Sequence, residues 1–115
     1  MAVQRIMPYH ASPDFDATRA FYTRVLRLEE RNFGGGYIGF GAGKAQVLFA
    51  RPGVDPPLPN MGVDVDARDA VDAAHARAVQ AGYEVIYGPV DEPWGVRRFF
   101  VTDPNGVVLS VLAHE

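Results

Sequence analysis

The sequence predicts an α+β fold made of two tandem βαβββ modules. The expected order is a strand, a helix and three strands, then a proline-rich joint over residues 51–60, and then the same order again. A local repeat supports a duplication, because DFDA at 14–17 recurs as DVDA at 64–67, and an alanine follows three positions later in both. The modules are expected at about 1–53 and 60–115, within one domain over 1–115.

In the first module, a helix is expected from Asp14 or Asp16 to about Arg27, because an Asp side chain can accept hydrogen bonds from the free amides of the first turn. Three glycines at 34–36 interrupt the chain after it. The predicted apolar face of this helix comprises Ala17, Phe21, Val25 and Leu28. Short strands are predicted at 3–9, 37–40 and 45–50.

In the second module, Asp66 is expected to cap a helix that runs to about Ala81, and Gly82 to end it in the left-handed conformation. The DPNG stretch at 103–106 predicts a hairpin turn. The predicted apolar face of the helix comprises Ala70, Val71, Ala74, Ala78 and Val79. Strands are predicted at 61–65, 83–87, 97–102 and 107–112.

Composition excludes several classes of protein. The 115 residues are 48% hydrophobic and 22% charged, which are ordinary values for a globular chain. The absence of cysteine excludes disulfides, thiolate zinc sites and cysteine nucleophiles. A net charge of −3 argues against a nucleic-acid partner. With no long apolar run and no signal-peptide pattern, we expect a cytoplasmic protein with no membrane partner.

Two conspicuous patterns have ordinary interpretations. The stretch GGGYIGFGAGKA does not predict a phosphate-binding loop, because alanine follows Lys44 and the stretch leads into a strand. Its glycines are expected in hairpin turns and bends. The three histidines, His10, His75 and His114, lack the close spacing of metal ligands, so they are expected to be surface or packing residues.

The segment EPWGVRRFF near the end of the chain is the most informative for binding. Because side chains alternate along a strand, Arg98 and Phe100 share one face, and Trp94 lies close by in sequence. Aromatic planes beside a guanidinium suit a flat or anionic organic ligand. The alternative is that Trp94 and the phenylalanines belong to the core.

Three segments together resemble the vicinal oxygen chelate superfamily, which includes glyoxalase I, extradiol dioxygenases and bleomycin resistance proteins. They are DFDATRAFYTRVL, DVDARDAVDAAHARAVQAGYEV and PWGVRRFFVTDPNGVVLSVL. One departure is Arg27, where family members often have glycine. The resemblance implies two modules curled into a half-barrel cup, with helices on the convex side, and a homodimer. Exchange of modules between chains through the joint 51–60 is one way to form it.

The metal site that the resemblance implies is missing its ligands. Family enzymes place His or Glu on the first strand of each module and Glu on the last strand. Alignment puts Met7, Asn60 and Ser110 at these positions, and these residues are poor ligands for hard divalent ions. We therefore expect no metal and no cofactor, and no Lewis-acid chemistry at this centre.

A cup without a metal resembles the family members that bind and sequester antibiotics. We expect a binding protein for an aromatic natural product, with Tyr37 and Trp94 clamping flat rings and Arg98 orienting polar groups. No catalytic residue is assigned. The expected ligand-binding residues are Met7, Tyr9, Tyr37, Gln46, Leu48, Asn60, Trp94, Arg98, Phe100, Ser110 and Leu112.

Two alternatives stay open. The first is a metal-independent isomerase or lyase of the same fold, for which Asp64, Tyr9 and Tyr37 are the acid–base candidates. The second is a module that binds no small ligand, which a pocket filled by its own side chains would favour.

Overall fold

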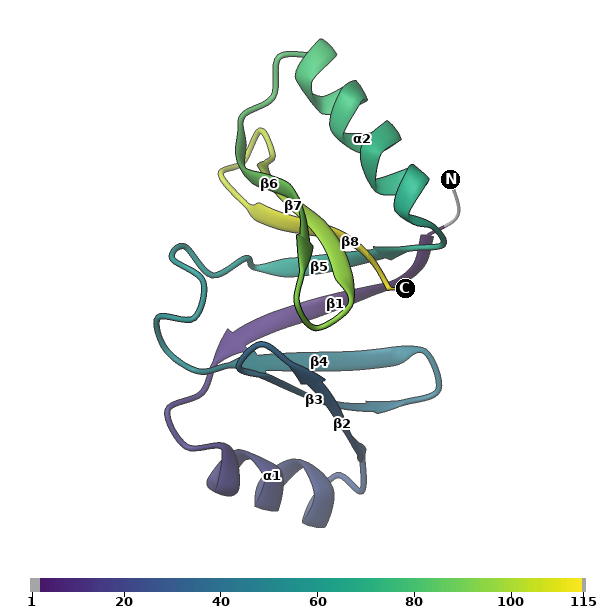
Figure 1. Cartoon of the computed structure of the whole chain (residues 1–115). Coiled ribbons are helices and arrows are strands. Elements are labelled where there is room, and N and C mark those ends of the chain that lie inside the picture. The colour runs from purple at the N-terminus through teal and green to yellow at the C-terminus, as the bar shows by residue number, and fades with distance from the viewer. Residues whose placement is uncertain (1–2, 115) are drawn as a thin grey trace.

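The computed structural model of the chain describes residues 3–114 (Figure 1). The elements in chain order are β1 (Val3–Ala11), α1 (Phe15–Arg24), β2 (Glu29–Gly34), β3 (Tyr37–Ala42), β4 (Ala45–Ala50), β5 (Met61–Val65), α2 (Arg68–Gln80), β6 (Val85–Glu92), β7 (Val96–Thr102) and β8 (Val108–His114). The order of strand, helix and three strands therefore occurs twice, as predicted. Over residues 3–114, neither helix has the length and apolar content needed to cross a membrane.

The strands form one sheet in the order β2-β3-β4-β1-β5-β8-β7-β6. In each module the first strand pairs in parallel with the last, β1 with β4 and β5 with β8. The antiparallel pair β1–β5 joins the two modules within one chain. Counted outward from this seam, each module contributes its first, fourth, third and second strand in turn. The sheet curls into the half-barrel that the sequence predicts.

The helices cover the outer, convex face of the sheet at opposite ends (Figure 1). On α1, Tyr22 stacks against Phe40 with ring centres 5.4 Å apart. On α2, Val71 is fully buried and packs with Phe99 in the core of the second module. The concave face carries a separate apolar cluster, which includes Met7. Neither α1 nor α2 covers this face, and the candidate site lies on it.

The predicted apolar face of α1 is wrong at Ala17, Phe21 and Val25, which are exposed, whereas Leu28 packs against the core of the first module as predicted. Phe21 and Val25 are 50% and 63% exposed, whereas Phe15 and Tyr22 pack against the sheet. Both sides of this helix carry large apolar residues, so spacing alone does not fix its rotation. The sheet selects the side on which Tyr22 can stack on Phe40.

Several predicted boundaries also change. Asp14 is the cap of α1 and accepts a hydrogen bond from the amide of Ala17 at 3.0 Å, but Asp66 does not cap α2, whose N-cap is Ala67. The strand predicted at 83–87 begins at Val85 and extends to Glu92. The polar strand β2 was not located in the sequence, because EERNFG has no apolar period and forms an edge strand that pairs only with β3.

Candidate functional site

The four central strands bring one row of residues to the middle of the concave face. Met7 on β1 is the register partner of Gly62 on β5, and Gly62 is the partner of Ser110 on β8. On the other side of Met7, the amide nitrogen of Gln46 on β4 donates to the Met7 sulfur at 2.8 Å. The row across β4, β1, β5 and β8 is therefore Gln46, Met7, Gly62 and Ser110.

This register corrects the alignment that placed Asn60 beside Met7 and Ser110. Asn60 lies before β5 and is exposed, and its side-chain oxygen accepts a hydrogen bond from the Val108 amide at 2.9 Å. Gly62 takes the central position instead.

The Tyr9 side chain fills the space that Gly62 leaves open. A methyl group on Gly62 would lie 2.3 Å from the Tyr9 hydroxyl, so only glycine lets the phenol reach the middle of the row. The hydroxyl lies beside the buried Ser110 side chain. Burial raises the pKa of Tyr9 to about 12, so this phenol stays protonated at neutral pH.

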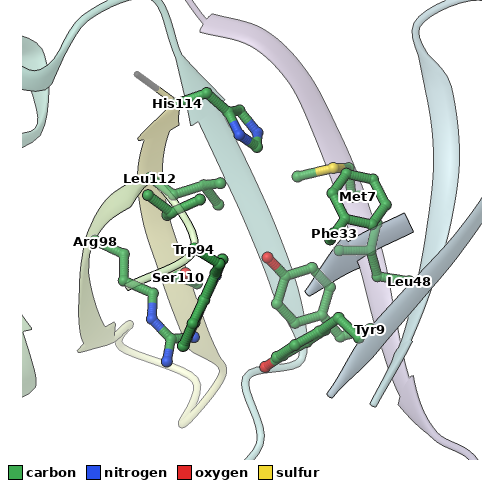
Figure 2. A pocket seen from close by; sticks show the side chains of 11 residues that line it. Met7, Tyr9, Phe33, Leu48, Trp94, Arg98, Ser110, Leu112 and His114 are labelled. Carbon is green, nitrogen blue, oxygen red and sulfur yellow. The ribbon is translucent and has the colours of Figure 1, made fainter. Parts of the chain in front are cut away.

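A cavity of about 40 Å³ lies on the concave face beside Tyr9 (Figure 2). It has room for on the order of three water molecules. Eight of the eleven residues predicted to bind a ligand line it, namely Met7, Tyr9, Tyr37, Leu48, Trp94, Arg98, Ser110 and Leu112.

The other three predicted residues lie elsewhere. Asn60 is at the end of the joint, as described above. Gln46 is buried, and its amide oxygen accepts a hydrogen bond from Arg31 at 2.8 Å. Phe100 lines a second hollow, of about 370 Å³, together with Asp55 and Tyr87.

Arg98 on β7 is held by two carboxylates at one end of the cavity. Its guanidinium donates to both oxygens of Asp55 at 3.1 Å and through Nε to Glu92 Oε2 at 2.7 Å, and its Nη2 forms an ion pair with the same Glu92 oxygen at 2.6 Å. Burial alone would lower the pKa of Arg98, but the hydrogen bonds and charges of Asp55 and Glu92 outweigh it, so the pKa is raised. The rings of Trp94 and Phe100 lie 5.3 and 4.8 Å from the guanidinium carbon.

Asp55 also ties the proline-rich joint to the first module. The Tyr37 hydroxyl donates to Asp55 Oδ2 at 2.5 Å. Burial, followed by this hydrogen bond and the charge of Asp55, raises the pKa of Tyr37, so this phenol is also protonated at neutral pH. The joint therefore closes the Arg98 end of the cavity through one carboxylate.

Sequence reasoning missed three residues that line the cavity, Phe33, Val96 and His114. Phe33 comes from the unlocated strand β2, and its ring reaches inward over Gly39, which has no side chain to block it. His114, expected to be a surface or packing residue, belongs to β8 and lies at the end of the cavity away from Arg98 (Figure 2). Alternation from Ser110 through Leu112 was the signal that could have placed His114 on this face.

A buried carboxylate, Asp64, lies behind His114 and does not itself line the cavity. Asp64 Oδ2 lies 3.7 Å from His114 Nε2 and 2.9 Å from Arg5 Nε. The Asp64 side chain is only 4% exposed, whereas that of His114 is 43% exposed. His114 faces the cavity, and this carboxylate lies behind it at an ion-pair distance that is too long for a hydrogen bond, so His114 is a candidate for proton transfer.

Trp94 closes the cavity from the turn between β6 and β7. Its ring packs on the glycine turn between β2 and β3, where a methyl group on Gly35 would lie 2.8 Å from the ring. Gly35 also has a φ of 61°, which favours glycine. Gly35, Gly36 and Gly43 thus lie in hairpin turns, whereas Gly39 and Gly41 lie within β3, and the contact of Trp94 with Gly35 joins the two modules across the cup.

Comparisons with known proteins agree with this fold. The sequence model of the Glyoxalase/Bleomycin resistance protein/Dioxygenase superfamily matches residues 8–111. The chain belongs to this superfamily. A mycobacterial protein named "Putative glyoxylase CFP32", from Mycobacterium tuberculosis and Mycobacterium bovis, is 37% identical over 102 residues, which cover 84% of this chain and 39% of the relative. The chain therefore spans less than half the length of these curated relatives.

Two solved structures illustrate the likeness within the superfamily. The Mn(II)-bound glyoxalase from Novosphingobium aromaticivorans is 26% identical with a TM-score of 0.65, and the match covers 96% of this chain and 38% of that protein. A superfamily member from Vibrio splendidus 12B01 is 14% identical with a TM-score of 0.65, and the match covers 95% and 97%. The second likeness concerns the fold alone.

The central row of this superfamily member does not fit a resident divalent metal. Met7, Gln46 and Ser110 offer a thioether, an amide and a hydroxyl, and Gly62 offers no side chain. Hard divalent ions prefer carboxylates and imidazoles to such groups. Across residues 3–114, no three side chains of His, Cys, Asp or Glu gather into a set that could hold a metal ion.

Proposed function

We propose that this superfamily member is a metal-independent binding protein that holds a small aromatic molecule on its concave face. The observation that carries the proposal is a cavity with aromatic and aliphatic walls and polar groups at its two ends, Arg98 and His114. Small-molecule sites commonly combine mainly apolar walls with a few placed polar groups. The central row supports metal independence through the chemistry of its side chains. Sequestration of an aromatic natural product or antibiotic is the expected role.

Binding requires the cup to open. Pockets for organic ligands have volumes of roughly 300–1,000 Å³, whereas this cavity measures about 40 Å³. The small volume is the feature that favours the alternative, a module with no small ligand. The groups that close the cup are Trp94 on a turn and Asp55 on the joint, and neither belongs to a central strand. A ligand can therefore gain room while the eight-stranded sheet stays intact.

A ligand panel tests this proposal. Aromatic natural products, antibiotics among them, are titrated into protein that has been treated with a chelator, and melting temperature and Trp94 fluorescence are recorded. Trp94 is the only tryptophan, so its emission reports on this site alone. We expect a saturable change with at least one compound. A panel in which no compound alters either signal would overturn the proposal.

A matched pair of variants locates the site. Trp94→Ala removes a ring of the cavity wall, whereas Tyr83→Ala removes a ring that is 49% exposed elsewhere. Calorimetry is expected to give about tenfold weaker binding for Trp94→Ala, because stacked rings contribute about 1 kcal/mol. Tyr83→Ala is expected to bind as the wild type does. Equal affinities of the two variants would show that the ligand does not bind in the cup.

The pair of His114 and Asp64 favours a second function, a metal-independent isomerase or lyase. Of the three acid–base candidates named from the sequence, Tyr9 and Tyr37 have raised pKa values and keep their protons at neutral pH. Asp64 remains, and it lies behind His114, which lines the cavity. In this function His114 exchanges a proton with the substrate, and Asp64 positions its ring.

Deuterium exchange tests this second function. Small α-hydroxyketones are incubated with the protein in heavy water, and loss of the proton next to the carbonyl is followed by NMR. We expect His114→Gln and Asp64→Asn to abolish exchange, and His10→Gln, which changes an exposed histidine of β1, to leave it unchanged. Exchange that persists in His114→Gln, or is absent in the wild type, would rule this function out.

The homodimer stays a prediction. Within one chain, β1 and β5 already pair and join the modules, so the fold does not require module exchange. Light scattering at micromolar concentration tests the dimer itself. A mass of twice the 12.6 kDa chain is expected, and a monomer would contradict it.

A further inference from the structure

We propose that Asp55 occupies a carboxylate-binding site of this protein, and that an aromatic carboxylate binds by displacing Asp55 from Arg98. The inference rests on the proposed binding function and names the chemical class of its ligand. Asp55 is then a built-in occupant that holds the cup closed until a ligand with the same anionic group takes its place.

The contacts of Asp55 are those of a recognised ligand. Its two oxygens each accept a hydrogen bond of 3.1 Å from Arg98, and one of them also accepts from the Tyr37 hydroxyl at 2.5 Å. Two parallel bonds from one guanidinium are the geometry by which arginine selects a carboxylate. Arg98 and Tyr37 belong to strands of different modules, so the sheet itself builds the site.

Charge balance explains why Asp55 can leave. Arg98 faces two carboxylates, and the side chains of Arg98, Asp55 and Glu92 are only 7%, 12% and 8% exposed. When Asp55 withdraws, Glu92 still neutralises Arg98, so no buried cation is left unpaired. An incoming carboxylate restores the original number of charges. Glu92 ends strand β6, whereas Asp55 lies on the joint, so Asp55 is the exchangeable partner.

The space around Asp55 suits an aromatic carboxylate. Arg98 lines the cavity of about 40 Å³, and Asp55 lines the second hollow of about 370 Å³. The pair therefore separates the two spaces, and departure of Asp55 joins them. The Trp94 ring beside the Arg98 guanidinium (Figure 2) and the Phe100 ring would then flank the ring of the ligand.

The joint is fixed at its ends and held in the middle by side chains. The Arg51 amide donates to Gly36 at 3.0 Å, and the Asn60 amide donates to Val108 at 2.8 Å. Between these anchors, Asp55 forms its polar contacts, and Val54 and Leu58 pack against the apolar cluster of the cup. A ligand ring can replace the apolar contacts of Val54 and Leu58 as its carboxylate replaces Asp55.

Calorimetric titration of naphthoate and its neutral amide tests the exchange. Both compounds are titrated into the wild type, Asp55→Asn and Asp91→Asn. The Asp91→Asn control removes the same charge at an exposed carboxylate that pairs with Arg68 and Arg97. Asp55→Asn is expected to bind naphthoate about tenfold more tightly, because the competing carboxylate is gone and more of the protein is competent to bind. The control is expected to match the wild type, and the amide to bind at least about tenfold more weakly than naphthoate.

The outcomes separate this inference from the binding function. Equal binding of naphthoate and its amide, or unchanged affinity in Asp55→Asn, overturns the exchange but leaves aromatic binding intact. Absence of naphthoate binding by every variant also overturns the exchange, whereas the binding function is decided separately by the panel of aromatic compounds. If Asp55→Asn does not fold, hydrogen exchange of the wild-type protein tests whether the ligand displaces Asp55. Saturation with naphthoate must speed exchange of the Val54 amide, which donates to the Arg51 carbonyl at 3.2 Å, and unchanged exchange there overturns the proposal.

Discussion

The Asp55 carboxylate accepts two hydrogen bonds of 3.1 Å from the Arg98 guanidinium, across 43 positions of sequence. This contact joins the loop between the modules to strand β7 and closes one end of the cup. The other end is formed by His114 and the buried Asp64. The cup thus has an arginine–carboxylate pair at one end and a histidine–carboxylate pair at the other.

Arg98 is expected to contribute far more to stability than its neighbour Arg97. Arg98→Met leaves the buried carboxylates of Asp55 and Glu92 without their cation, so the free energy of unfolding should fall by about 3–5 kcal/mol. Arg97 pairs with Asp72 and Asp91, whose side chains are about half exposed, so Arg97→Met should cost less than about 1 kcal/mol. Urea unfolding measures both, and equal losses would show that the Arg98 cluster is not a buried network.

Stability is expected to fall at alkaline pH because of Tyr9. Its pKa is raised from 10 to about 12, so the unfolded chain loses this proton first as pH rises. The contribution of Tyr9 to the free energy of unfolding should be constant below pH 10 and fall by about 3 kcal/mol between about pH 10 and 12, in addition to a loss from Tyr37, whose pKa is also raised. Tyr9→Phe should lose less over this interval than the exposed control Tyr83→Phe. Identical curves for the two variants would refute the assignment to Tyr9.

A pair of glycines separates backbone strain from the Trp94 contact. Gly35 and Gly43 have similar φ angles of 61° and 59°. A methyl group added at Gly35 would collide with the Trp94 ring, whereas a methyl group added at Gly43 would have no neighbouring atom within 4 Å. Gly43→Ala should cost about 1 kcal/mol from the backbone alone. Gly35→Ala should cost more and shift the Trp94 emission to longer wavelength. An unchanged emission in Gly35→Ala would contradict the packing.

Arg27 is a site where glycine should stabilise the protein. It has a φ of 59°, a conformation that costs an L-residue roughly 1 kcal/mol. Arg27→Gly is therefore expected to raise the melting temperature, and Arg24→Gly, inside α1, to lower it. A decrease for both variants would mean that the Arg27 side chain contributes more than its backbone costs.

Much of the fold follows from local patterns in the sequence. Apolar periodicity and turn residues predict the repeated order of elements. Strand alternation together with the family alignment predicts that Arg98, Ser110 and Leu112 share one face, and all three line the cavity, whereas Phe100 from the same prediction does not. The glycine-rich stretch forms turns because positive φ is needed there, as at Gly35.

The remaining features depend on tertiary contacts that no local pattern records. The rotation of α1 is set by the stacking of Tyr22 on Phe40, and the polar strand β2 exists because β3 offers it a partner. The position of Gly62 depends on the β1–β5 register. The pairing of Asp55 with Arg98 connects residues that are far apart in the sequence, so no local sequence pattern predicts it.

The central claim, that this cup works without a metal, is tested most directly by metal content. The purified protein is dialysed against manganese, iron, nickel and zinc, and each metal is then measured per chain. The donor set of Met7, Gln46 and Ser110 predicts a stoichiometry near zero and no rise in melting temperature with any ion. One tightly held ion per chain would contradict the account and make metal-assisted catalysis the leading interpretation.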